Sequence, residues 1–95
     1  MARLPPLYAL RAFESAARQL SLTRAARELN ITQSAVSRHV KTLEHDLGCL
    51  LFERKGPSLK LTPTGLTLAK DLSSAFAEMQ GVCDLVRSGR GGLRL

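Results

Sequence analysis

The segment "LTRAARELNITQSAVSRHVKTLEHDLG", residues 22–48, decides the fold, because it predicts two helices joined by a very short turn. Asn30 enters the left-handed conformation at low cost, so it can end the first of these helices. Thr32 carries a typical N-capping side chain for the second helix, and Gly48 is a typical residue just after a helix. A short helix, a tight turn and a longer helix together predict a helix-turn-helix motif.

The two predicted helices also have faces that would pack on each other. The shorter helix, capped by Ser21 or Thr23, carries the pair Ala25 and Ala26, and small side chains let two helices cross closely. The longer helix repeats apolar residues at spacings of four, three and four, which predicts a buried stripe. That stripe consists of Val36, Val40, Leu43 and Leu47.

Flanking segments complete a small, mainly helical domain over residues 1–62. Upstream, Pro6 opens a predicted helix over about residues 6–19. Its apolar positions are Leu7, Leu10, Phe13, Ala17 and Leu20. Downstream, "LLFER" and "LKLT" are strand-like runs around "KGPS", which predicts a two-stranded wing with a tight reversal. Such a hairpin needs support from the helices, and Leu51 and Leu61 would supply it.

Residues 63–88 predict one long helix, opened by Thr62 as a cap and Pro63 in the first turn. Its apolar stripe is too long to be covered by so small a domain, so a second copy of the helix is expected to pair with it. The predicted dimerisation residues are Leu68, Ala69, Leu72, Ala75, Phe76, Met79, Val82, Cys83 and Val86. Residues 89–95, rich in glycine, are expected to form a flexible hinge and the start of a further domain.

The polar face of the third helix indicates what the domain binds. Its early turns carry short or basic donors within an arc of about 140° and no acidic residue, which suits entry into the DNA major groove. There, Gln pairs with adenine and Arg pairs with guanine or phosphate. The predicted recognition residues are Thr32, Gln33, Ser34, Ser37, Arg38 and Lys41.

Other basic and hydroxyl residues are placed to hold the DNA backbone. The net charge of +6 suits a polyanionic partner. At the start of the second helix, the predicted backbone contacts are Ser21, Thr23 and Arg24. On the wing, the predicted contacts to the backbone or minor groove are Arg54, Lys55, Pro57, Ser58 and Lys60.

Several other functions are disfavoured. No catalytic triad, phosphate loop or pair of carboxylates suited to a pocket is present, so an enzyme and a cofactor are not expected. His39 and His45 lie on different faces of one helix, which argues against a metal site. Cys49 and Cys83 lie among apolar residues and are expected to be reduced core residues. With neither a signal peptide nor a membrane span, the chain is expected to be cytoplasmic.

Two alternatives to sequence-specific DNA binding remain open. A helix-turn-helix can serve protein contacts alone, although the donor-rich early turns lack the aromatic residues and Met that protein interfaces favour. A non-specific architectural DNA binder would use dense positive charge or intercalating wedges. A charge of +6 over 95 residues is modest for that class.

Specific motifs then identify a family resemblance over about residues 5–88. "SLTRAAREL", "TQSAVSR", "LEHDLG", "LFER" and "LTPTG" together closely resemble the DNA-binding domain of LysR-type transcriptional regulators. The opening "LPPLYALRAFESAAR" resembles the branch that regulates glycine-cleavage and β-lactamase genes. The resemblance departs at Leu22, where an aromatic is common, and at Ser58, where the wing often carries a basic residue.

The resemblance implies a winged helix-turn-helix followed by a dimerising linker helix. It also implies a dimer on dyad-symmetric operator DNA, and tetramers in full-length members. Family members bind a small effector in a two-lobed domain that would follow Leu95. An effector would therefore bind outside these 95 residues.

Overall fold

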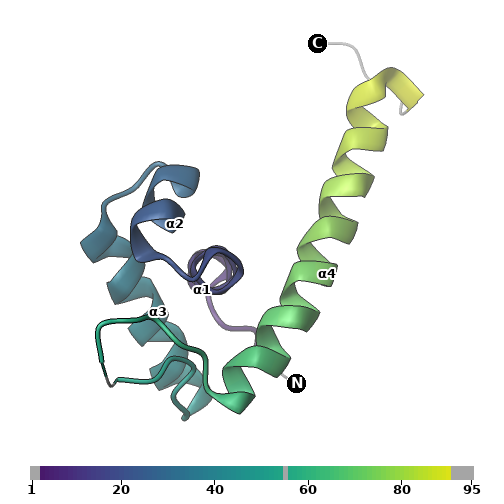
Figure 1. Ribbon diagram of the computed structural model, residues 1–95. Coiled ribbons are helices and arrows are strands. Elements are labelled where there is room, and N and C mark those ends of the chain that lie inside the picture. Colours follow the sequence, from purple (N-terminus) through teal and green to yellow (C-terminus); the bar gives the residue numbers. More distant parts are fainter. Residues whose placement is uncertain (1–2, 55, 91–95) are drawn as a thin grey trace.

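The computed structural model describes residues 3–54 and 56–90. Within them a body of three helices and a short hairpin is followed by a long helix that projects away from it (Figure 1). The α-helices are α1 (Leu7–Gln19), α2 (Leu22–Leu29), α3 (Gln33–Leu47) and α4 (Pro63–Leu85), and a π-helical turn, Val86–Arg90, follows α4. The mainly helical fold class and the helix-turn-helix are confirmed.

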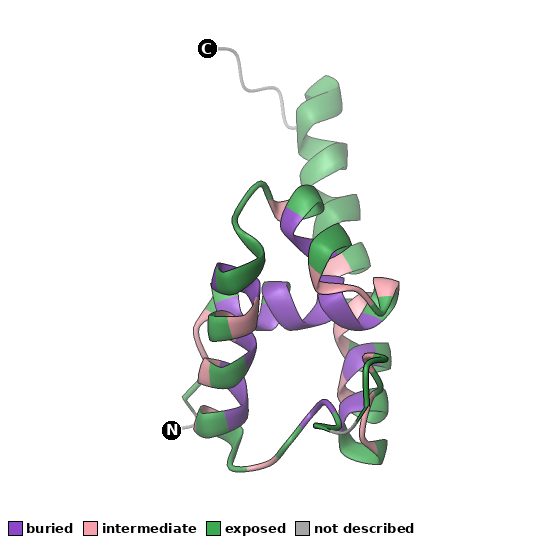
Figure 2. Ribbon diagram, turned by 60° about the vertical axis from the view of Figure 1, so that its left-hand side comes forward, coloured by how far each residue is buried: buried purple, intermediate pink, exposed green. Residues whose placement is uncertain are grey.

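The core is built around α1, which contacts each of the other three α-helices (Figure 2). Of the predicted positions, Leu10, Phe13 and Ala17 are buried. The prediction that Leu7 and Leu20 are buried is wrong, because both are more than half exposed. They lie at the two ends of α1, beyond the part that the neighbouring helices cover. Three alanines that the pattern missed are fully buried, because a helix enclosed on several sides needs small side chains there: Ala9, Ala12 and Ala16.

Capping residues lie at the starts and ends of α2 and α3, as the sequence predicts. Ser21 rather than Thr23 caps α2, its hydroxyl accepting from the Arg24 N–H at 3.0 Å. Thr32 accepts from the Ala35 N–H at 3.0 Å at the start of α3. Asn30 and Gly48 take left-handed conformations after α2 and α3, as expected (φ 58° and 74°).

The apolar stripe of α3 is confirmed over three positions and wrong at the fourth. Val36, Val40 and Leu43 are buried, whereas Leu47 is 42% exposed. Leu47 is the last residue of the helix and extends beyond the body. The buried position in that turn is taken by Glu44 instead, whose carboxylate reaches the backbone of the next segment.

The predicted wing is a hairpin with very little pairing. In the described part of the chain it contains no strand, only one antiparallel bridge between Phe52 and Leu61. The N–H groups of Leu51 and Phe52 donate to the Glu44 carboxylate and are therefore not available for a longer ladder. Leu51 is fully buried and Leu61 packs partly on the core, as predicted. Lys55 lies outside the described residues.

The long helix is packed at its start and exposed along the rest of its length. Ala69 is buried, and Leu72 and Phe76 pack partly on the core. The α-helix ends at Leu85 rather than at Ser88, and a π-helical turn follows in which Gly89 leaves helical geometry (φ 90°). The predicted strand-like residues 93–95 lie outside the described residues.

The two cysteines differ in burial. Cys49 is half-buried beside the core, whereas Cys83 is exposed, so its prediction as a core residue was wrong. Cys83 lies beyond the part of α4 that touches the body.

Gly65 lets α4 begin directly against the hairpin. A Cβ atom built on Gly65 would lie 2.1 Å from the carbonyl oxygen of Leu51, closer than any non-bonded contact allows. The neighbouring Thr62 caps α4 through the Gly65 N–H and also donates to the Leu50 carbonyl at 2.9 Å. The start of α4 is thus fixed to the hairpin by backbone contact.

We expect Gly65→Ala to destabilise the domain by about 1–3 kcal/mol, because the methyl group would push α4 off the Leu51 backbone. Gly81→Ala on the same helix is the matched control, since a Cβ there meets nothing within 4 Å. That control should stabilise the helix by up to about 1 kcal/mol. Urea unfolding of both variants checks this, and equal effects would contradict the proposed steric role of Gly65.

Candidate nucleic-acid interface

The predicted recognition residues form a polar surface on the first turns of α3. Gln33, Ser34, Arg38 and Lys41 are exposed and Ser37 is half-buried. Acidic residues on α3 come only from Glu44 onwards, and the Glu44 carboxylate faces the hairpin backbone. The outer face of the first two turns therefore offers donors without a competing carboxylate.

Hydrogen bonds hold the start of this surface in place. The Thr23 hydroxyl on α2 donates to the Gln33 amide oxygen at 3.0 Å, which joins the first turns of the two helices. Thr32 and Ser34 hydroxyls lie 3.2 Å apart. Among the described residues the Gln33 NH₂ group makes no hydrogen bond, so it can donate to a ligand.

Residues predicted to contact DNA, from α2, α3 and the hairpin, border one groove. The first turn of α2, the first residue of α3 and the hairpin meet around it. Its lining includes predicted contacts from each: Ser21, Thr23, Gln33, Arg54, Pro57 and Ser58. The structure thus brings the predicted backbone contacts of α2 and the hairpin next to the predicted base-reading residue Gln33.

Other predicted residues lie apart from the groove or are already engaged. Arg38 and Lys41 lie one and two turns further along α3, and neither borders the groove. Arg24 and Lys60 are exposed and also outside it. The guanidinium of Arg54 pairs with Glu44, which restricts its reach.

Glu44 is a structural residue that the sequence analysis missed. It is only 6% exposed, and one carboxylate oxygen accepts from the N–H groups of Leu51 at 2.8 Å and Phe52 at 3.2 Å. The other oxygen pairs with Arg54. A signal was present, because Glu44 follows Val40 by four residues and so shares the buried face of α3.

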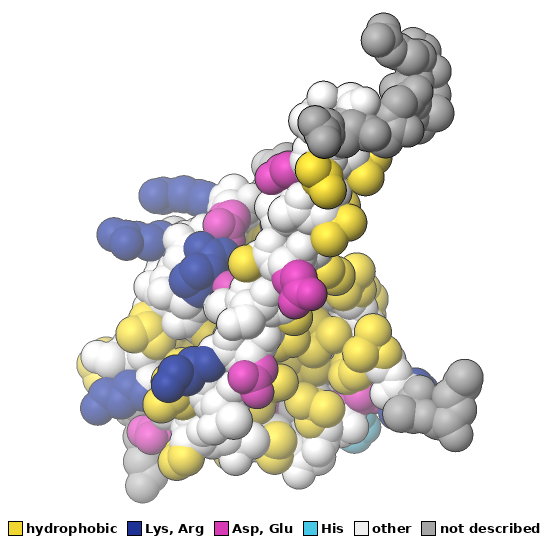
Figure 3. All heavy atoms as spheres, turned by 90° about the vertical axis from the view of Figure 1, so that its right-hand side faces the viewer, with side chains coloured by type: hydrophobic (Ala, Val, Ile, Leu, Met, Phe, Trp, Pro, Cys, Tyr) yellow, Lys and Arg dark blue, Asp and Glu magenta, His cyan; other side chains and the backbone are white. Residues whose placement is uncertain are grey.

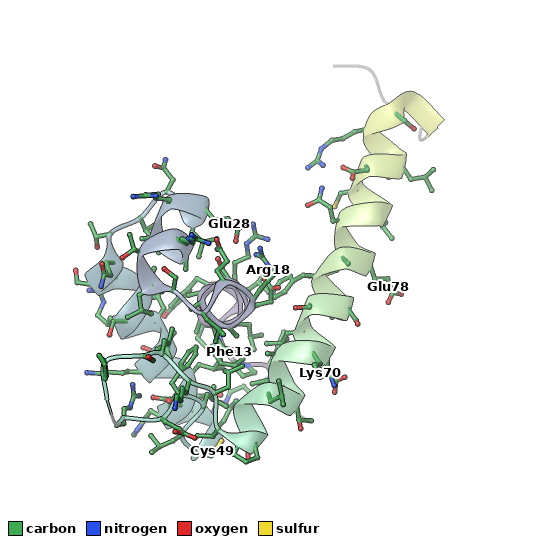
Figure 4. All side chains as sticks on the ribbon, viewed as in Figure 1. Phe13, Arg18, Glu28, Cys49, Lys70 and Glu78 are labelled. Atoms are coloured by element: carbon green, nitrogen blue, oxygen red, sulfur yellow. The ribbon has the colours of Figure 1, made fainter. Side chains whose placement is uncertain are left out.

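A second buried carboxylate, Glu14 on α1, belongs to a polar network with Arg18 and Glu28, both of which are labelled in Figure 4. Arg18 donates to Glu14 at 2.9 Å and to Glu28 of α2 at 2.5 Å. These bonds, first that to Glu14 and then that to Glu28, raise the pKa of the Arg18 guanidinium above its usual value. The bond from Arg18, followed by that from Ser15, lowers the pKa of the Glu28 carboxyl. The network joins α1 to α2 through the ion pair between Arg18 and Glu28.

The predicted dimerisation stripe falls into two parts. Leu68, Ala69, Leu72 and Phe76 contact the core of their own chain. The remaining five residues are exposed along the outer half of α4 and the first residue after it, where apolar side chains gather on the surface (Figure 3): Ala75, Met79, Val82, Cys83 and Val86. We call these five residues the outer stripe.

The described residues hold neither a candidate metal site nor a membrane-spanning helix. They contain no group of three or more His, Cys, Asp or Glu side chains that could hold a metal ion. No helix among them is long and apolar enough to cross a membrane.

Comparisons with known proteins agree on one family. Residues 7–66 match the model of "Bacterial regulatory helix-turn-helix protein, lysR family". The HTH-type transcriptional activator AmpR of Citrobacter freundii is 54% identical over 79 residues, which cover 83% of this chain and 27% of that protein. The glycine cleavage system transcriptional activator of Escherichia coli K12 is 47% identical over 93 residues, covering 96% of this chain and 30% of that protein.

Solved structures show the same fold. The crystal structure of the BenM_DBD/benA site 1 DNA complex is similar with a TM-score of 0.79 and 29% identity, covering 92% of this chain and 98% of that one. Full-length OxyR from Pseudomonas aeruginosa gives a TM-score of 0.77 and 32% identity, covering 87% of this chain and 28% of that one. The chain spans about 26–30% of the length of the curated relatives it matches. Those relatives are named as transcriptional activators.

We expect Glu44→Gln to destabilise the domain by about 1–3 kcal/mol, because an uncharged amide weakens the bonds to the hairpin N–H groups and leaves Arg54 unpaired. Amide hydrogen exchange at Leu51 and Phe52 should also become faster. Urea unfolding and exchange measured by NMR test both effects.

Asp46→Asn is the matched control, since it removes the same charge from the same helix. The side chain of its partner Arg3 is 74% exposed, against 15% for Asp46, so solvent screens the pair from the Arg3 side and the pair should contribute about 1 kcal/mol or less. Equal losses in the two variants would contradict the anchoring role of Glu44.

Proposed function

Since the chain belongs to the lysR family of bacterial regulatory helix-turn-helix proteins, we propose that it binds operator DNA sequence-specifically, as a dimer with α3 in the major groove. Membership of this family makes the chain the DNA-binding domain of a transcription regulator. The proposal adds that binding is sequence-specific, that α3 enters the major groove and that the bound protein is a symmetric dimer. It places the protein in the cytoplasm, with the DNA.

The observation that carries the proposal is the surface on the first turns of α3, which presents hydrogen-bond donors and no acidic residue. Gln33, Ser34 and Arg38 are exposed there, and Ser37 lies between them. Short hydroxyl side chains let the helix backbone approach the floor of the groove, while Gln and Arg reach base edges. BenM_DBD, which has the same fold, was crystallised with DNA.

We assign backbone contacts to the elements beside this surface. Thr23 and Arg24 at the exposed start of α2 would meet one phosphate strand. Lys60 and the tip of the hairpin would meet the neighbouring strand or the minor groove. Ser21 contributes indirectly, because its hydroxyl is used to cap α2.

The second part of the proposal is that the outer stripe binds the same stripe of another copy. Met79 and Val82 are 46% and 58% exposed, and the residues of the outer stripe lie along one side of the helix. Covering them with a second α4 would remove apolar surface from water and place two copies of α3 for a dyad-symmetric site. In a longer chain we expect tetramers and a small effector bound beyond these residues.

Selection of bound sequences from a random duplex pool, at two salt concentrations, tests the DNA-binding proposal. We expect an enriched motif with two-fold symmetry. Salt-sensitive binding without an enriched motif would instead indicate a non-specific basic scaffold. On the selected duplex, Arg38→Ala should weaken binding by about 1–3 kcal/mol, because a base contact is lost.

Arg87→Ala controls for the loss of one positive charge. Arg87 is exposed in the π-helical turn after α4 and pairs with Asp84 of α4, far along the chain from α3. We expect binding of this variant to change little. If Arg38→Ala and Arg87→Ala weakened binding equally, net charge rather than groove contact would explain the affinity.

We expect Met79→Glu or Val82→Glu to dissociate the dimer, because each places a charge in the outer stripe. These positions are preferable to Leu72 and Phe76, where a charge would also disturb the core of the chain itself. Light scattering over a range of concentrations measures the effect.

Ala77→Glu is the control, because Ala77 is exposed and lies about 140–160° around the helix from Met79 and Val82. A Val82→Glu variant that remains as dimeric as Ala77→Glu would place the interface elsewhere.

A further inference from the structure

Glu14 of α1 lies where the body meets α4 and is bonded from both sides. Its carboxylate is 6% exposed. From α1, Arg18 Nε donates at 2.9 Å and Arg18 Nη2 at 3.3 Å. From α4, the Ser73 hydroxyl donates to the Glu14 carboxylate at 2.8 Å.

In the described part of the chain, this is the only hydrogen bond between a side chain of α4 and the helices α1–α3. The other contacts of α4 with the body are the backbone contact of Gly65 with the hairpin at the start of the helix and the largely apolar packing of Ala69, Leu72 and Phe76. Apolar packing has no preferred direction, so it tolerates small rotations and tilts of a helix. A hydrogen bond loses strength steeply as its angle changes, and so it fixes the rotation and tilt of α4 at Ser73.

Ser73 lies close to the point where α4 leaves the body. From Ala77 to Leu85 every residue is exposed, and this part of α4 projects away from the body (Figure 1). The segment from Ser73 to Leu85 rises about 18 Å. A tilt of about 10° at Ser73 therefore moves the far end by about 3 Å, close to the base-pair rise of about 3.4 Å.

We propose that Ser73, through its hydrogen bond to Glu14, is a positioning residue that sets the half-site spacing read by the dimer. This inference rests on the proposed function, because it needs two copies joined by the outer stripe. The bond connects the direction of α4, which holds the partner, to α1, on which α2 and α3 pack. Each copy contributes the same angle, so a change in it would alter the distance between the two α3 helices twice over.

The structure also shows which variant isolates this bond. In Ser73→Ala the Glu14 carboxylate keeps both bonds from Arg18, so no unpaired charge is left. Alanine is also a better helix former than serine, so α4 itself should persist. Ser73→Thr keeps a hydroxyl at the same place and serves as the conservative variant. Ser74→Ala is the matched control, because Ser74 is exposed.

The test measures binding to duplexes that carry the selected half-sites at spacings changed in single base-pair steps. We expect the wild type and Ser74→Ala to prefer one spacing at least tenfold over its neighbours, and Ser73→Ala to lower this preference to threefold or less. Ser73→Thr should restore it. Binding to a duplex with a single half-site should be equal in all four proteins.

Each contrary outcome has a distinct meaning. A wild-type spacing preference that Ser73→Ala retains would overturn the role of Ser73 and leave the proposed function intact. A Ser73→Ala protein that is no longer dimeric by light scattering would also overturn it, because spacing would then fail for lack of a partner. A wild type without any spacing preference would overturn both this inference and the proposed dyad.

Discussion

Enclosure of α1 is the constraint on which the rest of the structure depends. The other three α-helices all contact it, and a central helix can accept so many neighbours only if its side chains are small. Ala9, Ala12 and Ala16 meet that need, while Phe13 fills the remaining space and packs edge-to-face against Phe52 with ring centroids 5.4 Å apart. The positions of α3 and α4, and so of both proposed interfaces, follow from this one packing arrangement.

Two buried carboxylates connect this apolar core to its less regular parts. Glu44 holds the hairpin, and Glu14 holds α4. Both have charged partners and several donors, so their burial does not leave an unpaired charge. Apolar contacts thus bring the elements together, and these two carboxylates add directional hydrogen bonds to the hairpin and to the long helix.

Local chemistry made much of the fold predictable from sequence. Asn30, Thr32 and Gly48 act within a few residues of themselves, so their roles as helix ends could be read directly. Errors arose where burial depends on distant parts of the chain. Leu47 has the spacing of a core residue but extends past the body, whereas Glu44 is polar and buried because the hairpin backbone comes to it. The recognition surface of α3 was predictable as a surface, but the bond from Thr23 to Gln33 depends on how α2 and α3 cross.

The exposed outer half of α4 also has a thermodynamic consequence. An isolated helix shorter than about 12–15 residues is marginal in water, and from Ala77 to Leu85 every residue of this one is exposed. Helix formation there and capture of a partner are therefore linked equilibria, and a second copy would order the segment as well as cover it. Part of the association free energy is consumed in this ordering, so helix content should depend on protein concentration by mass action.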